Sequence, residues 1–134
     1  MPLKELFAEE CIAIHHDTEG GWLHVDWRGY QTVGTVQAGC ERILELMVEH
    51  RTGRVLNDNT NVVGIWSGAS EWVAVDWFPR MKAAGLTCFA WVYSPSRFSQ
   101  VSTDETLARM DSEAVGVKVF DDVDDARAWL RSCP

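Results

Sequence analysis

The side chains best suited to hold a metal ion are His15, His24 and Asp26, which lie on two neighbouring segments near the N-terminus. Imidazole and carboxylate together suit a divalent transition metal. If the two segments pair as a β-hairpin, one polar face gathers all three groups. Histidines that face each other across solvated strands usually contact only water, so we predict no metal and no cofactor.

The other arrangements that could do chemistry are missing from the sequence. No serine has a Gly-x-Ser-x-Gly elbow around it, and no cysteine has a recognisable partner histidine. Gly64 and Gly68 lack the lysine and the spacing of a phosphate-binding loop. The acidic run at 121–125 is typical of a helix cap and a solvated first turn. We therefore predict a protein that is not an enzyme, with an unrecognised hydrolase or metalloprotein as one alternative.

Composition narrows the class of protein and of partner. The chain has 134 residues, a formal charge of −8 and a pI near 4.8. Its twelve Lys and Arg are scattered, so no basic stripe could neutralise a nucleic-acid backbone. The four cysteines are widely spaced, and the sequence has no stretch typical of a signal peptide, so we predict a cytoplasmic protein. It also has no run of eighteen apolar residues, so we predict no membrane span. We predict one domain over 1–134.

The N-terminal half predicts a hairpin, a helix and a strand. Residues 11–17 and 22–28 alternate between apolar and polar types on either side of a Gly-Gly turn, as expected of a β-hairpin. Over 32–51 apolar residues recur at steps of three and four, which indicates an amphipathic helix, and 54–58 is a short strand. The four-residue loop sets a register that pairs His15 with His24, Ile12 with Trp27 and Ile14 with Val25.

The C-terminal half alternates helices and strands. A loop at 59–66 leads to a helix over 67–84, kinked or divided at Pro79 and ended by Gly85. Strand 87–93 follows, and Ser102 with Glu105 forms a capping box for a third helix to Met110. Strand 117–120 and a last helix complete an α/β fold, whose mixed, mostly parallel sheet has about five strands.

Aromatic residues are concentrated in the second helix and in strand 87–93. Within that strand Cys88, Ala90 and Val92 present a small face, and the alternate positions present a large aromatic one. The aromatic residues suit a crowded core, a homodimer interface or the wall of an apolar pocket. The candidates for the interface or pocket are Trp66, Trp72, Trp77, Phe89, Trp91 and Tyr93.

Three segments carry a resemblance to a known family. They are the strand that ends at Asp58 with the polar stretch after it, the segment TCFAWVYS at 87–94, and FDDVDDARAWL at 120–130. In these segments and in its order of elements the chain resembles the STAS superfamily, which includes the anti-sigma-factor antagonists. The resemblance is to small, stand-alone bacterial members. It implies a compact β/α domain that acts by protein–protein contact, often as a phosphorylation-controlled switch in bacterial signalling.

The resemblance also implies a place for the switch. In such antagonists the modified residue is a Ser or Thr in the loop after the strand that ends here at Asp58. That stretch makes Asp58, Asn59 and Thr60 a possible switch loop, with Thr60 the nearest hydroxyl. The predicted function is a non-enzymatic, self-associating regulatory module of this kind, with an unknown protein partner. The first alternative is a carrier of a small apolar or amphipathic ligand, and the second alternative is an unrecognised hydrolase or metalloprotein.

Overall fold

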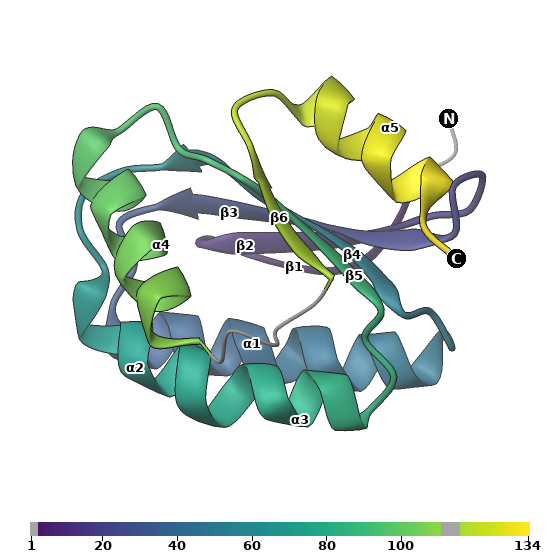
Figure 1. Ribbon diagram of the computed structural model, residues 1–134, viewed down its shortest axis with the longest axis horizontal. Helices are drawn as coiled ribbons and strands as arrows, with labels where there is room; N and C mark the ends of the chain where they lie inside the picture. Colours follow the sequence, from purple (N-terminus) through teal and green to yellow (C-terminus); the bar gives the residue numbers. More distant parts are fainter. Residues whose placement is uncertain (1–2, 111–115) are drawn as a thin grey trace.

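A single mixed sheet organises the chain (Figure 1). The computed structural model describes residues 3–110 and 116–134. Strands β1 to β3 pair antiparallel and β3 to β6 pair parallel, in the order β1-β2-β3-β4-β5-β6. The predicted mixed α/β fold is therefore present, with six strands where about five were expected. The strands are β1 (Leu3–Glu9), β2 (Ile12–Asp17), β3 (Trp22–Gly29), β4 (Arg54–Val62), β5 (Cys88–Val92) and β6 (Val117–Phe120).

The predicted hairpin is β2 and β3, and its register is confirmed: His15 pairs with His24, Ile12 with Trp27 and Ile14 with Val25. The missed strand, β1, adds an antiparallel edge to β2. An irregular step between Glu5 and Phe7 breaks its register, and no residue of β1 is fully buried. The period-two pattern that reveals a half-buried strand is therefore absent there.

Helices α1 (Val33–Glu49), α2 (Ser70–Trp72) and α3 (Phe78–Ala83) cover one face of the sheet (Figure 1). The predicted helix over 67–84 combines a 3-10 turn (Ser67–Ala69), α2, a π-helical turn (Val73–Trp77) and α3. Pro79 lies in the first turn of α3, directly after the wide π turn. Proline has no N–H to bond to the preceding turn, so a change in helix type is expected there. Gly85 follows at φ +114°.

Helix α4 (Arg97–Arg109) lies beyond the carboxyl ends of the parallel strands (Figure 1). The predicted capping box is wrong, because Ser102 and Glu105 lie inside this helix. The Ser102 hydroxyl is buried and accepts a hydrogen bond from the backbone N–H of Trp66 at 2.9 Å. Among the described residues of α4 the fully buried side chains are all hydroxyls: Ser99, Ser102, Thr103 and Thr106.

Helix α5 (Val123–Ser132) covers the other face of the sheet (Figure 1). Its N-cap is Asp122, whose carboxylate accepts from the backbone N–H of Asp124, as the acidic run predicted. The two faces of β5 enter different cores: Phe89 and Trp91 face α1 to α3, and the small residues face α5. The predicted division of β5 is therefore confirmed. Among the described residues no helix has the length and apolar character needed to cross a membrane.

Candidate functional site

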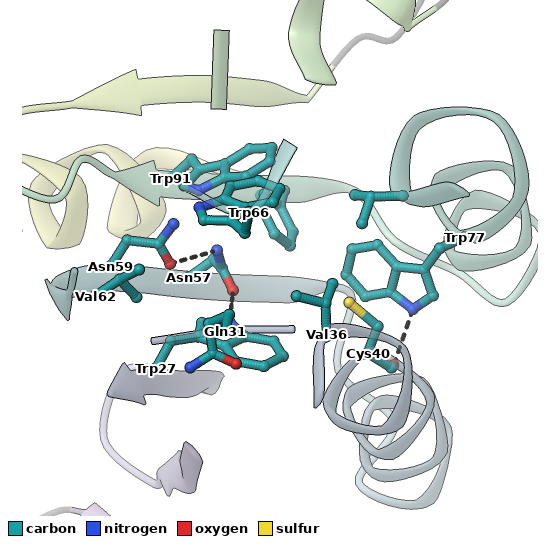
Figure 2. A pocket seen from close by; sticks show the side chains of 12 residues that line it. Trp27, Gln31, Val36, Cys40, Asn57, Asn59, Val62, Trp66, Trp77 and Trp91 are labelled. Carbon is teal, nitrogen blue, oxygen red and sulfur yellow. Dashed lines mark hydrogen bonds between the residues drawn. The ribbon is translucent and has the colours of Figure 1, made fainter. Parts of the chain in front are cut away.

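A cavity lies within the larger core, near the carboxyl ends of β4 and β5 (Figure 2). Ligands of open α/β sheets commonly bind outside these strand ends. The enclosed part of the cavity is small: the centre of a water molecule can move within about 30 Å³. The total space between the lining atoms is about 390 Å³, and this value includes the mouth that opens to solvent. One water molecule needs about 10 to 15 Å³ of the volume that is available to its centre. The enclosed part therefore holds about two water molecules, and a ligand the size of a phenyl ring has to extend into the open mouth.

Aromatic rings make most of the wall. Trp66 and Trp91 are stacked, with ring centroids 6.1 Å apart and planes inclined by 19°. Trp77 meets Phe89 edge to face at 5.9 Å, and its indole N–H donates to the carbonyl of Cys40 at 2.9 Å. The packed contacts hold the rings in place, so the cavity has a preformed shape.

Polar side chains line the opposite wall (Figure 2). The Asn57 carbonyl accepts from the Trp27 indole N–H at 2.8 Å, and its amide nitrogen donates to the Asn59 carbonyl at 3.4 Å. Both side-chain carbonyls thus have partners within the protein. Gln31 is also fixed: its amide nitrogen donates to two backbone carbonyls, and its oxygen accepts from the Thr35 hydroxyl.

One polar atom of the cavity has no partner. Trp91 is 3 % exposed, and its indole N–H donates to no atom of the described residues. Leaving a buried donor unpaired costs about 1 to 3 kcal/mol, and such groups in native proteins call for an explanation. Figure 2 shows the indole nitrogens of Trp91 and Trp66 at the same end of the stack, on the side of Asn59.

Apolar side chains surround the loop that carries Trp66. Tyr30 is 79 % exposed, Ile65 57 % and Phe98 67 %. A Cβ placed at Gly64 would meet the Tyr30 ring at 2.8 Å, and the Gly64 carbonyl accepts a hydrogen bond from Ser99 of α4. The β3–α1 segment, the loop after β4 and the start of α4 thus meet beside the cavity. Val33, Val63 and Val101 are further exposed apolar residues on these segments.

Of the six aromatic candidates from the sequence, the structure brings four together in the cavity wall: Trp66, Trp77, Phe89 and Trp91. The other two lie apart from it. Arg80 stands over the Trp72 ring at 5.7 Å, and the Tyr93 hydroxyl donates to Asp104.

Sequence reasoning missed Trp27, Gln31 and Asn57, and it named Asn59 only as part of the possible switch loop. Two asparagines separated by one residue in a strand were the available signal, because Asn is depleted in strands and both side chains share one face.

The possible switch residues lie in a strand, and the loop predicted for 59–66 is wrong in its first part. Strand β4 continues to Val62 because β3 pairs with it beyond Asp58, through Arg28 with Asn61 and Gly29 with Val62. Asn59 faces the cavity. The Thr60 hydroxyl and backbone N–H both donate to the Asp58 carboxylate.

Asp58 is the centre of a buried polar cluster on the other face of β4. His24 Nε2 donates to its carboxylate at 3.2 Å. Burial raises the pKa of Asp58, but the hydrogen bonds from His24 and Thr60 outweigh burial and leave the pKa below its usual value.

The metal candidates are engaged with other partners. His24 binds Asp58, and Asp26 accepts from Arg28 at 2.9 Å and from Asn61 at 3.1 Å. His15 lies opposite His24, as the register requires. Within residues 3–110 and 116–134 no three His, Cys, Asp or Glu side chains are grouped so that they could hold a metal ion.

Comparison with models of protein families finds no family that matches this chain. Comparisons with curated proteins and with solved structures find no match either.

Proposed function

We propose that this protein is a non-enzymatic binding domain that takes a small molecule into the cavity lined by Trp27, Trp66 and Trp91. The observation that carries the proposal is the unpaired indole N–H of Trp91, which is buried at a preformed cavity. An aromatic wall with a few fixed polar groups is the usual make-up of a small-molecule site. The position near the carboxyl ends of parallel strands supports it as well.

The chemistry of the lining favours binding over catalysis. Among the described residues, the polar side chains at the cavity are amides and indoles, apart from the thiol of Cys40. Amides and indoles do not titrate near neutral pH, so they cannot act as general acids or bases there. Burial and the neighbouring Glu41 raise the pKa of the Cys40 thiol, which keeps it in its weakly nucleophilic protonated form.

The exposed apolar residues favour a second candidate, a regulatory module that works by protein contact. Tyr30, Ile65 and Phe98 border the loop that carries Trp66, so a partner docked on them would touch the cavity mouth. The resemblance to the STAS superfamily supports this candidate, including its place in bacterial signalling and self-association as a homodimer. The free thiols of the four cysteines are consistent with a cytoplasmic location.

A screen of small molecules by NMR tests the main proposal. The chain has seven tryptophans, so the indole N–H region of a ¹H–¹⁵N spectrum contains few signals. We expect compounds that bind to move the signals of Trp66 and Trp91. Trp22 and Trp129 provide internal controls, because Trp22 lies in the core between the sheet and α5, and Trp129 of α5 packs against that core. If millimolar compounds of varied chemistry leave Trp66 and Trp91 unmoved, the proposal fails.

Sedimentation and point substitution test the second candidate. Phe98→Ser and Ile65→Ser remove exposed apolar area without touching a core residue. We expect them to lower self-association measured by analytical ultracentrifugation. Val75→Ser is the matched control, since Val75 is 59 % exposed on the π-helical turn. If the wild-type protein sediments as a monomer at high concentration, the proposed homodimer is wrong.

A further inference from the structure

The buried polar atom of the cavity that lacks a partner among the described residues is a hydrogen-bond donor. It is the indole nitrogen of Trp91, a residue that is 3 % exposed. The side-chain carbonyls of Asn57 and Asn59 already accept bonds. Gln31 uses both its amide nitrogen and its oxygen. An occupant therefore meets an N–H group that needs an acceptor.

The lining also lacks charge. Among the described residues that line the cavity there is no Lys, Arg or His, and no Asp or Glu. The whole chain carries a formal charge of −8. Burying an anion there would remove it from water without a countercharge, which is strongly unfavourable. A cation would find no carboxylate among the described lining residues, and each side-chain carbonyl there already accepts one hydrogen bond.

Shape restricts the occupant further. The stacked pair of Trp66 and Trp91 is one wall, and both indole nitrogens lie at its Asn59 end (Figure 2). A flat ring packs against such a surface with the largest contact area, and an acceptor on its rim would reach the donors at that end.

We infer that the cavity binds a small, uncharged, planar molecule that carries a hydrogen-bond acceptor such as a ketone carbonyl, and that the Trp91 indole N–H donates to that acceptor. This inference deepens the proposed function and rests on it. The acceptor satisfies the buried donor of Trp91 on binding, so the polar group adds to affinity instead of opposing burial. A water molecule is the competing occupant, since it can also accept from this N–H group.

Four probes of one size separate these possibilities: acetophenone, benzoate, benzylammonium and ethylbenzene. All four present a phenyl ring, and they differ in the group beside it. A hydrogen bond to an otherwise unpaired buried donor is worth about tenfold in affinity. We expect acetophenone to bind about tenfold more tightly than ethylbenzene, and benzoate and benzylammonium to bind more weakly than acetophenone. The Trp91 indole proton should shift downfield with acetophenone alone.

The variant Asn59→Asp replaces the hydrogen-bond donors of the Asn59 side chain with a charged acceptor. Aspartate keeps the oxygen that accepts from Asn57 and removes the two amide donors. We expect the variant to lose most of the preference for acetophenone over ethylbenzene and to improve binding of benzylammonium. Val63→Asp is the control for added charge, because Val63 is exposed outside the cavity. Circular dichroism shows whether each variant is folded.

The outcomes distinguish a failure of the inference about the acceptor from a failure of the proposed ligand binding. If ethylbenzene binds as tightly as acetophenone and both move the Trp66 and Trp91 signals, the cavity binds ligands but the inference about the acceptor is wrong. Tighter binding of benzoate than of acetophenone also overturns the inference, since it shows a preference for anions. If no probe moves either signal, water is the only occupant and the proposed function fails with the inference.

Discussion

Gly39 of α1 lies against the ring of Trp27, one of the residues that line the cavity. A Cβ built at this position would lie 2.3 Å from Cη2 of Trp27, 2.6 Å from Cζ3 of the same ring and 3.0 Å from Cδ1 of Ile12. Trp27 is buried, and its indole N–H is fixed by Asn57 at 2.8 Å. Gly39→Ala must therefore displace a buried, hydrogen-bonded ring.

The expected magnitude follows from two opposed effects. Alanine gains about 1 kcal/mol over glycine inside a helix. Overpacking costs about 1 to 3 kcal/mol, and breaking the bond from Trp27 to Asn57 adds about 1 kcal/mol or more. We expect Gly39→Ala to lower the free energy of unfolding by about 2 kcal/mol. Gly34→Ala in the same helix is the control, because the nearest atom to its Cβ is Thr32 Oγ1 at 3.7 Å. It should be neutral or stabilise by up to about 1 kcal/mol.

Urea denaturation followed by circular dichroism at the helix band measures both variants on the same scale. A signal from the backbone is preferable to tryptophan fluorescence, because Trp27 itself is expected to move. A Gly39→Ala protein that is as stable as the Gly34→Ala protein would refute the reasoning. It would mean that α1 and Trp27 are not packed as closely as the structure shows.

Three further predictions concern individual side chains. In a Tyr30→Phe protein the one remaining tyrosine is Tyr93, and its pKa should be about 12, because burial and then the hydrogen bond to the Asp104 carboxylate raise it. Absorbance at alkaline pH measures this ionisation. A pKa near 10 would contradict the contact between Tyr93 and Asp104. Ser102→Ala should lower the free energy of unfolding by about 1 to 3 kcal/mol, because it leaves the buried backbone N–H of Trp66 without its acceptor, and a change under 0.5 kcal/mol would argue against this bond. The pKa of Asp58 is lowered on folding, so its charge stabilises the native state above the unfolded pKa, and this contribution is lost as the pH falls through the folded pKa. The stability difference between wild type and Asp58→Asn should therefore shrink on acidification from pH 6 to pH 3, and a constant difference would contradict the assignment.

Local patterns predicted the elements whose residues alternate or recur regularly. The hairpin register followed from alternation and loop length, and the two faces of β5 followed from small and large residues at alternate positions. Strand β1 was missed because it is a half-exposed edge with an irregular step. The capping box at Ser102 was wrong for a different reason. A buried hydroxyl that serves another segment has the same sequence signature as one that caps its own helix.

The cavity could be foreseen only in part. The sequence singled out Trp66, Trp77, Phe89 and Trp91 for a crowded core, a homodimer interface or a pocket wall, and in the structure all four line the cavity. Its amide side chains were not foreseen as a group, since their positions depend on which strand lies beside which. Trp27 meets Asn57 only because β3 and β4 are parallel neighbours, and that pairing is a property of the tertiary fold.

The most direct test of the cavity as a ligand site is a crystal structure of the protein grown or soaked with acetophenone. We predict the phenyl ring against the stacked pair of Trp66 and Trp91, with the ketone oxygen within about 3 Å of the Trp91 indole nitrogen. An acetophenone ring elsewhere on the molecule, with the Trp91 N–H still bonded to water or to nothing, would contradict the account.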